Sequence, residues 1–359
     1  MLRNSIALKN AFITKILRTG WGSSATLAVL SMIVSLLALC LCSYFAGASP
    51  LQVMVALFEG ALRGRYALTT TLSEWVAMTL CGLAVLIPYR AGFFNVGGQG
   101  QLEVGAVAAA AVALSLNAPR PLVIMLALAA AVAAGLLAVS VPLILRLRRG
   151  ASEVTTTIMM NFACIQFMYA MVTGPLKDAR SWYGTTPPVP QAYQLPSFPP
   201  GSGIPAGMWV AALIALAAAW LMNSTVFGLY LRAVGSNRPA AVAAGIPVNR
   251  VLTGAVLMGA ALAGLAGGLQ LLGYTFRVAE GWSKSWGLVG IPIALLGGNP
   301  LGVLVVGFLF AILETGARSM QALTGAPAAL IYLFQGLPVI IYLGLRASAW
   351  YSRWSQAAG

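Results

Sequence analysis

The sequence predicts an all-α, polytopic helical membrane protein. Of its 359 residues, 60% are apolar and only 8% are charged, and the mean hydropathy is +0.88. Soluble domains contain about 45–50% apolar and about 25% charged residues. The apolar residues also form continuous runs, such as 104–114, whereas a membrane β-barrel would alternate apolar and polar residues. At about 20 residues per crossing, the composition allows about eight to ten membrane helices.

Ten apolar runs bounded by charges, Pro or Gly are the predicted membrane segments. In chain order they cover residues 25–46, 72–88, 101–116, 121–145, 154–173, 206–223, 250–272, 285–297, 301–318 and 327–345. The first run is long enough to span a membrane and follows several basic residues, so it is read as a first helix and not as a cleaved signal. We expect a cytoplasmic leader (1–24), one transmembrane domain (25–346) and a cytoplasmic tail (347–359).

The basic residues favour an orientation with both termini inside. Of 21 Lys and Arg, thirteen would then lie on the cytoplasmic side and eight outside, in the direction of the positive-inside rule. The net charge of +14 is therefore attributed to topology and to contact with anionic lipid, and no nucleic acid is expected as a partner. The chain has no His, and its four Cys lie inside apolar runs. We expect these cysteines to be packing residues, with no metal site.

Two connections differ from the other, shorter loops. The outer loop at 174–205 contains eight of the nineteen prolines, which predicts a stiff, extended segment that forms a lid or a docking surface. In the inner connection, Asn237 is a capping residue, an alanine-rich stretch follows, and Gly245 is a typical stop. This pattern predicts a short helix outside the bilayer at about 237–246.

Two membrane segments are predicted to be broken. Residues 87–101 combine Pro88 with glycines and polar amides, and residues 287–300 contain repeated Gly and Pro. Irregular backbone at membrane depth is tolerated only where protein or a water-filled cavity covers it. Short, interrupted helices in both halves of a chain point to a translocation path.

Six polar side chains near these segments are candidates for lining such a path. Thr157 and Asn161 are four residues apart and share a helix face, which suits hydrogen bonding to a neutral polar solute. An equally simple alternative is close packing through glycine together with hydrogen bonds between helices. The candidates are Asn95, Gln99, Gln101, Glu103, Thr157 and Asn161.

Two further acids have local explanations. Glu153 follows Ser152 at a predicted helix start, where a carboxylate favours the positive end of the helix dipole. Glu314 could pair with Arg318 at helical spacing. The glycine cluster at 97–100 resembles a phosphate loop only superficially, because neither Lys-Ser nor Lys-Thr follows it and no strand precedes it.

Several segments resemble the permease subunit of bacterial ABC importers. They are AGFFNVGGQGQL (91–102), SEVTTTIMMN (152–161), GPLKD (174–178), RAVGSN (232–237) with AAVAAGI (240–246), MQ (320–321) and QGL (335–337). The resemblance covers nearly the whole chain from about residue 70. It is closest to the branch that serves nucleosides, and more distant from those for simple sugars and branched-chain amino acids.

The resemblance implies a non-catalytic subunit of the bacterial cytoplasmic (inner) membrane that moves a nucleoside or related small polar solute inward. ATP and Mg would bind to a partner, and this chain would bind no cofactor. The implied partners are cytoplasmic ABC ATPase subunits, a second homologous or identical permease, an extracytoplasmic substrate-binding protein and membrane lipid. The residues implied to couple to the ATPase are Asn237, Ala240, Ala241, Ala244, Gly245 and Ile246.

Two other functions stay open, one from the residues and one from the resemblance. An ion-coupled secondary transporter could use Glu103 or Glu153, and an ABC permease could instead serve simple sugars. A membrane enzyme is disfavoured, because a chain without His and with buried Cys offers no metal-ligand or nucleophile constellation.

Overall fold

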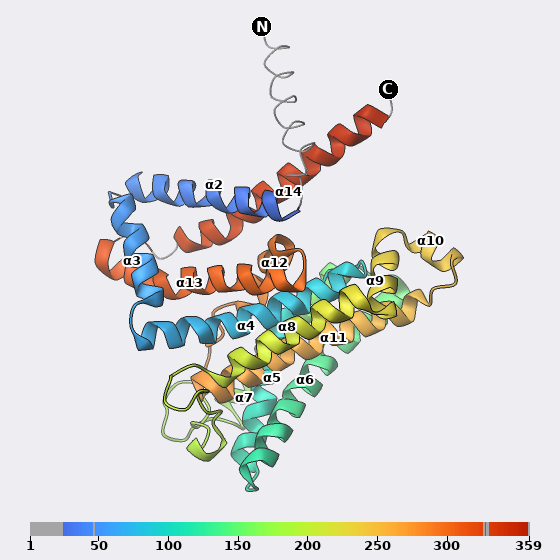
Figure 1. The fold of residues 1–359 in the computed structure, drawn as a ribbon. Coiled ribbons are helices and arrows are strands. Elements are labelled where there is room, and N and C mark those ends of the chain that lie inside the picture. The colour runs from blue at the N-terminus through green and yellow to red at the C-terminus, as the bar shows by residue number, and fades with distance from the viewer. Residues whose placement is uncertain (1–23, 46, 326, 328–329, 358–359) are drawn as a thin grey trace.

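The computed structural model describes residues 24–45, 47–325, 327 and 330–357. The expected leader at 1–24 therefore lies almost wholly outside the described residues. Figure 1 shows the fold, in which helices are joined by loops; the described part of the chain contains two isolated β-bridges but no extended strand. The predicted all-α class is confirmed.

Each of the ten predicted membrane segments overlaps one of the longer helices of the described residues. In chain order the longer helices are α2 (Ser24–Phe45), α3 (Pro50–Leu62), α4 (Arg65–Arg90), α5 (Gly98–Ser115), α6 (Arg120–Arg149), α7 (Glu153–Thr173), α8 (Ala206–Ser224), α9 (Val226–Ser236), α11 (Val248–Gln270), α12 (Trp286–Gly297), α13 (Pro300–Thr324) and α14 (Leu330–Ala357). The short ones are η1 (Gln191–Tyr193), α10 (Arg238–Ala243) and the π-helical turn η2 (Leu271–Thr275).

Seven of the described helices are long and apolar enough to cross a membrane: α2, α4, α6, α7, α8, α11 with η2, and α13. The other three predicted segments correspond to α5, α12 and α14. The sequence did not predict α3 or α9. Both are shorter than a membrane crossing, with 13 and 11 residues, so a search for long apolar runs passes over them.

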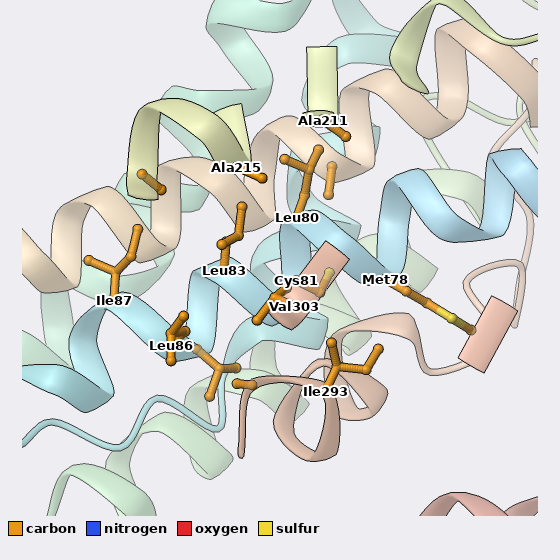
Figure 2. Close-up of a cluster of buried hydrophobic side chains, with 14 of the residues drawn as sticks. Met78, Leu80, Cys81, Leu83, Leu86, Ile87, Ala211, Ala215, Ile293 and Val303 are labelled. Atoms are coloured by element: carbon orange, nitrogen blue, oxygen red, sulfur yellow. The ribbon is translucent and has the colours of Figure 1, made fainter. Parts of the chain in front are cut away.

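The centre of the bundle is α4. Almost every residue from Thr70 to Pro88 is buried, and α4 packs against α11, α12 and α13. Figure 2 shows Leu80 and Leu83 of α4 together with Ala211 of α8 and Ile293 of α12. By contrast, most of the surface of α2, α6, α7 and α8 is not buried within the chain. These outer helices are therefore the ones available to lipid or to another subunit.

Small residues allow the helices around α4 to approach closely. A Cβ atom on Gly105 of α5 would lie 2.5 Å from the carbonyl oxygen of Gly264 in α11, and one on Gly135 of α6 would collide with the backbone of Ala260. Close contact through Gly is typical of membrane helices, where van der Waals packing replaces the hydrophobic effect as the source of association.

The bundle has two distinct ends. We call the end with α9 and α10 the α10 end, and the end with residues 174–205 the loop end; the two lie on opposite sides of the bundle (Figure 1). The 174–205 loop is fixed to the chain beyond α11. The backbone amide of Leu195 donates to Leu272 (2.8 Å), that of Val189 to Phe276 (2.8 Å), and that of Thr186 to Val278 (2.9 Å).

Candidate translocation site and coupling helix

The first predicted break lies between α4 and α5. It is shorter than the predicted 87–101, because α4 continues through Pro88 to Arg90 and α5 begins at Gly98. The irregular backbone is limited to residues 91–97, where Gly92 has a φ of 78°. This left-handed conformation suits glycine and lets the chain reverse direction.

Polar side chains fill this break and bind its backbone. Asn95 donates to the Gln101 amide oxygen (3.1 Å) and accepts from the backbone of Gly97 (3.0 Å). Thr157 and Asn161 of α7 are both buried at the same break. Thr157 accepts from the amide of Val96 (3.2 Å).

Asn161 adds a second bond between α7 and this region by accepting from the backbone amide of Gly100 in α5. A Cβ on Gly100 would lie 2.7 Å from the Cβ of Cys164, so glycine is required for α5 and α7 to approach this closely. The predicted shared face of Thr157 and Asn161 is confirmed. In this conformation both side chains form hydrogen bonds between elements of the chain.

Glu103 is the centre of a second buried cluster. Its Oε1 atom accepts from the Gln99 amide (2.8 Å) and from the Ser283 hydroxyl (2.7 Å). Gln99 also donates to Ser283 and accepts from the backbone amide of Gly287 (2.8 Å). The other carboxylate oxygen, Oε2, is buried and has no hydrogen-bond partner among the described residues. The cluster joins α5 to the start of α12 and leaves one acceptor free.

The second predicted break is smaller than expected. The chain is helical from Trp286 to Gly297, through Pro292, so the prediction of an interrupted 287–300 segment is wrong for most of its length. The interruption consists of Gly298, with a φ of 63°, and Asn299, whose side chain caps α13 by accepting from Gly302 (2.8 Å). Tertiary contacts override the local preference, because Gly287 and Gly290 pack directly against the backbones of Gln99 and Cys81.

A buried ion pair at the start of α12 was not predicted. Glu74 of α4 has no exposed surface. Its carboxylate accepts from the Lys284 ammonium and from the indole N–H of Trp286. The sequence did contain a signal, since an acid within a membrane segment is a functional candidate by default. Two buried carboxylates, Glu74 and Glu103, thus hold residues 283–286 from two different helices.

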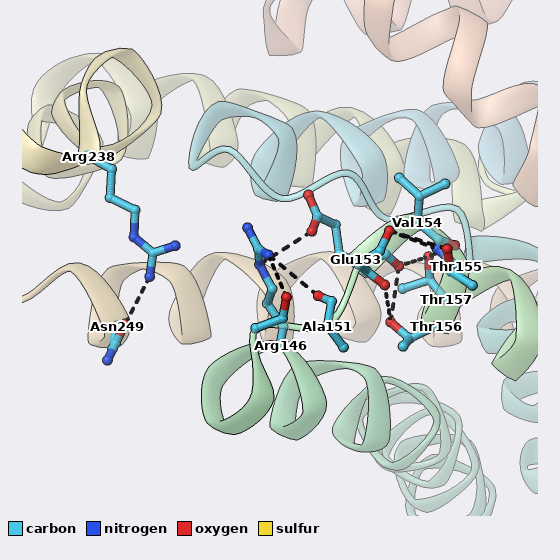
Figure 3. Close-up of polar contacts among 11 residues, drawn as sticks. Arg146, Ala151, Glu153, Val154, Thr155, Thr156, Thr157, Arg238 and Asn249 are labelled. Atoms are coloured by element: carbon cyan, nitrogen blue, oxygen red, sulfur yellow. Dashed lines mark hydrogen bonds and ion pairs between the residues drawn. The ribbon is translucent and has the colours of Figure 1, made fainter.

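The other two acids have local partners. Ser152 caps α7 by accepting from the amide of Thr155 (3.5 Å). Glu153 forms an ion pair with Arg146 of α6 (3.3 Å), as Figure 3 shows. The expected pairing of Glu314 with Arg318 is not among the ion pairs of the described residues; instead, Glu314 accepts a hydrogen bond from Gln335 (3.2 Å).

The predicted short helix at 237–246 is present as α10. The Asn237 side chain caps it by accepting from Ala240 (3.1 Å), and Gly245 ends the turn with a φ of 77°. Ala241 is buried against Val234 and Val248, so it packs α10 onto its own chain and is not available for docking.

The outward face of α10 has a different set of side chains. Ala240 and Ala244 are exposed, Ile246 is half-buried, and Val242 is 60% exposed. Arg238 bridges the base of α10 to Asn249 of α11 (3.2 Å, Figure 3). Sequence reasoning placed the helix but did not identify Val242 as its most prominent apolar side chain.

Comparison with known proteins identifies the family. Residues 67–343 match a protein family described as "Branched-chain amino acid transport system / permease component". The chain belongs to this permease family. The match extends from α4 to α14 and so includes both breaks, the 174–205 loop and α10.

Individual relatives of the permease are named for different solutes. It is 32% identical to the guanosine ABC transporter permease protein NupP of Bacillus subtilis, over 84% of this chain and 88% of the relative. It is 31% identical to the glucose ABC transporter permease protein TsgB13 of Haloferax volcanii (82% and 80%). It is 29% identical to the nucleoside ABC transporter permease protein NupB of Lactococcus lactis subsp. cremoris (76% and 78%).

Proposed function

We propose that this permease is the non-catalytic transmembrane subunit of an ABC importer that moves a nucleoside or related small polar solute inward. The observation that carries the proposal is the family match over residues 67–343, together with relatives named for guanosine and nucleosides. The chain lacks a phosphate loop. ATP and Mg would therefore bind to separate ABC ATPase subunits.

The proposed topology has ten crossings, with both termini in the cytoplasm of a bacterial inner membrane. Besides the seven long apolar helices, α5, α12 and α14 would complete the count. The α10 end would be cytoplasmic. The count of basic residues in the sequence supports this orientation, since thirteen of the 21 Lys and Arg would then be cytoplasmic and eight outside. Seven of the thirteen lie near the α10 end. They are Arg90, Arg146, Arg148, Arg149, Arg232, Arg238 and Arg250.

The exposed face of α7 supports a second permease subunit beside a shared path. Met159 and Phe162 are 68% and 63% exposed, and Gln166 is exposed on the same face. Within the described part of the chain, the Gln166 amide has no hydrogen-bond partner. An unpaired amide facing hydrocarbon would be costly. We therefore place the partner permease and the solute path against this face.

The buried polar residues behind α7 would form the inner wall of the path. This wall is closed in the present conformation, because its side chains bind one another or nearby backbone. They are Asn95, Gln99, Gln101, Thr157 and Asn161. Displacement of α12 would expose the free acceptor of Glu103. Alternating access requires such a change between two arrangements.

The ATPase would dock on the exposed face of α10, and an extracytoplasmic binding protein would dock on the 174–205 loop. α10 is suited to this role because its cap and its buried Ala241 fix it to the bundle, while Val242 projects away. The 174–205 loop exposes apolar side chains, including Trp182 at 94% and Phe198 at 57%. Exposed aromatic side chains of this size are typical of protein contact surfaces.

Two alternatives each have one supporting observation. The similarity to a glucose permease favours a simple sugar as solute. The free, buried oxygen of Glu103 favours an ion-coupled secondary transporter. Competition for uptake separates the solutes. In proteoliposomes that also contain the ATPase and binding-protein subunits, unlabelled nucleosides should suppress guanosine uptake and glucose should not. Suppression by glucose alone would contradict the nucleoside proposal.

A further inference from the structure

A basic cavity of about 400 Å³ opens at the loop end, between the start of α4, the end of α13 and the segment before α12. Its lining includes Arg63, Arg65, Lys284, Thr315, Arg318 and Ser319. Arg63 pairs with the exposed Glu59 (2.7 Å). Among the ion pairs of the described residues, none involves Arg65 or Arg318. The Thr315 hydroxyl is buried and has no hydrogen-bond partner in the described chain. The cavity therefore presents positive charge that no ion pair of the described residues compensates.

Lys284 belongs both to this cavity and to the buried ion pair. Its side chain is 27% exposed, whereas its partner Glu74 has no exposed surface. An anion that enters the cavity can reach the Lys284 ammonium without reaching Glu74. A new anion at Lys284 would compete with the Glu74 carboxylate for the same ammonium charge and would draw the ammonium toward the cavity, which weakens its bond to Glu74.

The backbone at Lys284 has an unfavourable conformation that the side-chain bonds to Glu74 and Glu103 stabilise. Lys284 and Ser285 have φ angles of 43° and 60°, in the left-handed region that is unfavourable for residues with a Cβ. α12 begins at the next residue. Side-chain bonds to Glu74 and Glu103 hold residues 283–286 in place. Loss of the Lys284 contact would thus allow the start of α12 to relax.

We propose that a carboxylate side chain of the extracytoplasmic binding protein enters this cavity and binds the Lys284 ammonium in place of the Glu74 carboxylate. The loss of the Glu74–Lys284 bond then releases the start of α12. The proposal rests on the proposed function, which supplies the partner. Charge complementarity selects a carboxylate. The position of the cavity selects the binding protein, because the cavity adjoins the 174–205 loop: the Thr69 hydroxyl, one turn after Arg65, donates to the carbonyl of Gly203 (2.9 Å).

Cys81 provides a native reporter for movement of α12. It is 1% exposed and belongs to the buried core drawn in Figure 2, which also contains Ile293 of α12. A Cβ on Gly290 of α12 would lie 2.7 Å from the carbonyl carbon of Cys81. Displacement of α12 should therefore expose this thiol. The other three cysteines, Cys40, Cys42 and Cys164, would be replaced by Ser.

The test uses the full chain alone in phosphatidylcholine nanodiscs, with hexaglutamate as the probe and hexaglutamine as its neutral control. Hexaglutamate should raise the rate of maleimide labelling at Cys81 by about fivefold or more, the lower end of typical coupling between sites. Hexaglutamine should leave the rate unchanged. If phosphatidylglycerol in the nanodisc raises the rate without peptide, the cavity binds an anionic lipid headgroup and the proposal is overturned.

Variants separate the role of Lys284 from general charge effects. Lys284→Gln should label quickly with or without hexaglutamate, and Lys284→Arg should keep the response. Arg148→Gln, which removes an exposed arginine of α6 near the α10 end, is the control and should behave like the parent chain. A peptide response that persists in Lys284→Gln, or no response in the parent, would overturn the proposal.

A further variant keeps the test valid if Lys284→Gln does not fold. Arg318→Gln leaves the Glu74–Lys284 pair intact and should only raise the hexaglutamate concentration needed for half of the effect; an unchanged concentration would count against the cavity. Because no ATPase is present, the result of this labelling assay does not depend on the result of the uptake assay. ATP-driven uptake without a Cys81 response would refute this inference alone.

Discussion

Arg90, in the last turn of α4, donates a hydrogen bond to the carbonyl of Gly298, the residue that follows α12. On its other side, the carbonyl oxygen of Arg90 lies against Gly235 of α9, where a Cβ atom could not be accommodated. α9 leads directly into α10 through Asn237. The proposed docking helix is thus connected to the end of α12 through one arginine.

This connection predicts that Arg90→Gln uncouples ATP hydrolysis from transport. Gln is shorter and uncharged, so it should not reach the Gly298 carbonyl, and a movement of α10 would no longer be passed to α12. We expect uptake to fall by about tenfold, within the usual range of coupling between sites, while ATPase activity falls less. Paired uptake and phosphate-release assays measure both. Arg148→Gln, at an exposed arginine of α6, should change neither rate; equal losses in Arg90→Gln would argue against coupling.

The exposed and buried side chains of α10 predict different defects when they are substituted: loss of ATPase binding and loss of permease stability. Val242→Glu places a charge on a side chain that is 60% exposed, so the permease should fold normally but lose the ATPase during co-purification. Ala241→Glu should instead destabilise the permease itself, because Ala241 is buried and the new carboxylate would be unpaired. Thermal unfolding distinguishes the two. Trp182→Glu at the loop end serves as the control, and normal ATPase binding by Val242→Glu would mean that α10 is not the docking helix.

The Glu103 cluster predicts different effects for two substitutions. Glu103→Leu leaves the donors of Gln99 and Ser283 without their acceptor, which should lower the free energy of unfolding by about 1–3 kcal/mol for each donor that stays unsatisfied. Glu103→Gln keeps an acceptor and should cost less. Denaturation of the purified variants in detergent tests this order. If both variants were as stable as the parent chain, the cluster would contribute nothing to the fold.

Close helix packing predicts a position-dependent cost of adding a methyl group. Gly105→Ala would place Cβ 2.5 Å from the backbone of Gly264, whereas Gly254→Ala in α11 would lie 3.4 Å from the flexible ring of Phe227. We expect Gly105→Ala to cost about 1–3 kcal/mol, as other overpacked cores do, and Gly254→Ala to be nearly neutral. The midpoint of thermal unfolding compares the two. Similar midpoints would mean that α5 and α11 can separate without penalty.

Much of the fold could be predicted from the sequence, because long apolar runs and caps are local signals. Asn237 and Gly245 bracket α10 as expected. The sequence overestimated the length of both breaks. Pro88 lies inside α4 and Pro292 inside α12, and close glycine contacts hold neighbouring backbone against these helices. α3 was missed because its apolar run is too short to count as a crossing.

The candidate site could be predicted only in part. Asn95, Gln99, Gln101, Glu103, Thr157 and Asn161 are all buried, and they lie at the first break or against the start of α12, not at the second break. The sequence could not show that they bind one another, because Ser283 and Gly287, which complete the Glu103 cluster, are far away along the chain. The Glu74–Lys284 pair also joins distant residues, and a single acid in an apolar run does not reveal its partner.

The most direct test of the central claim is the energy source of uptake. Proteoliposomes containing this permease, its ATPase and its binding protein should accumulate labelled guanosine when ATP is present on the ATPase side, and accumulation should stop in Val242→Glu. Uptake by the permease alone, driven by a proton or sodium gradient and unaffected by ATP, would contradict the account and favour a secondary transporter.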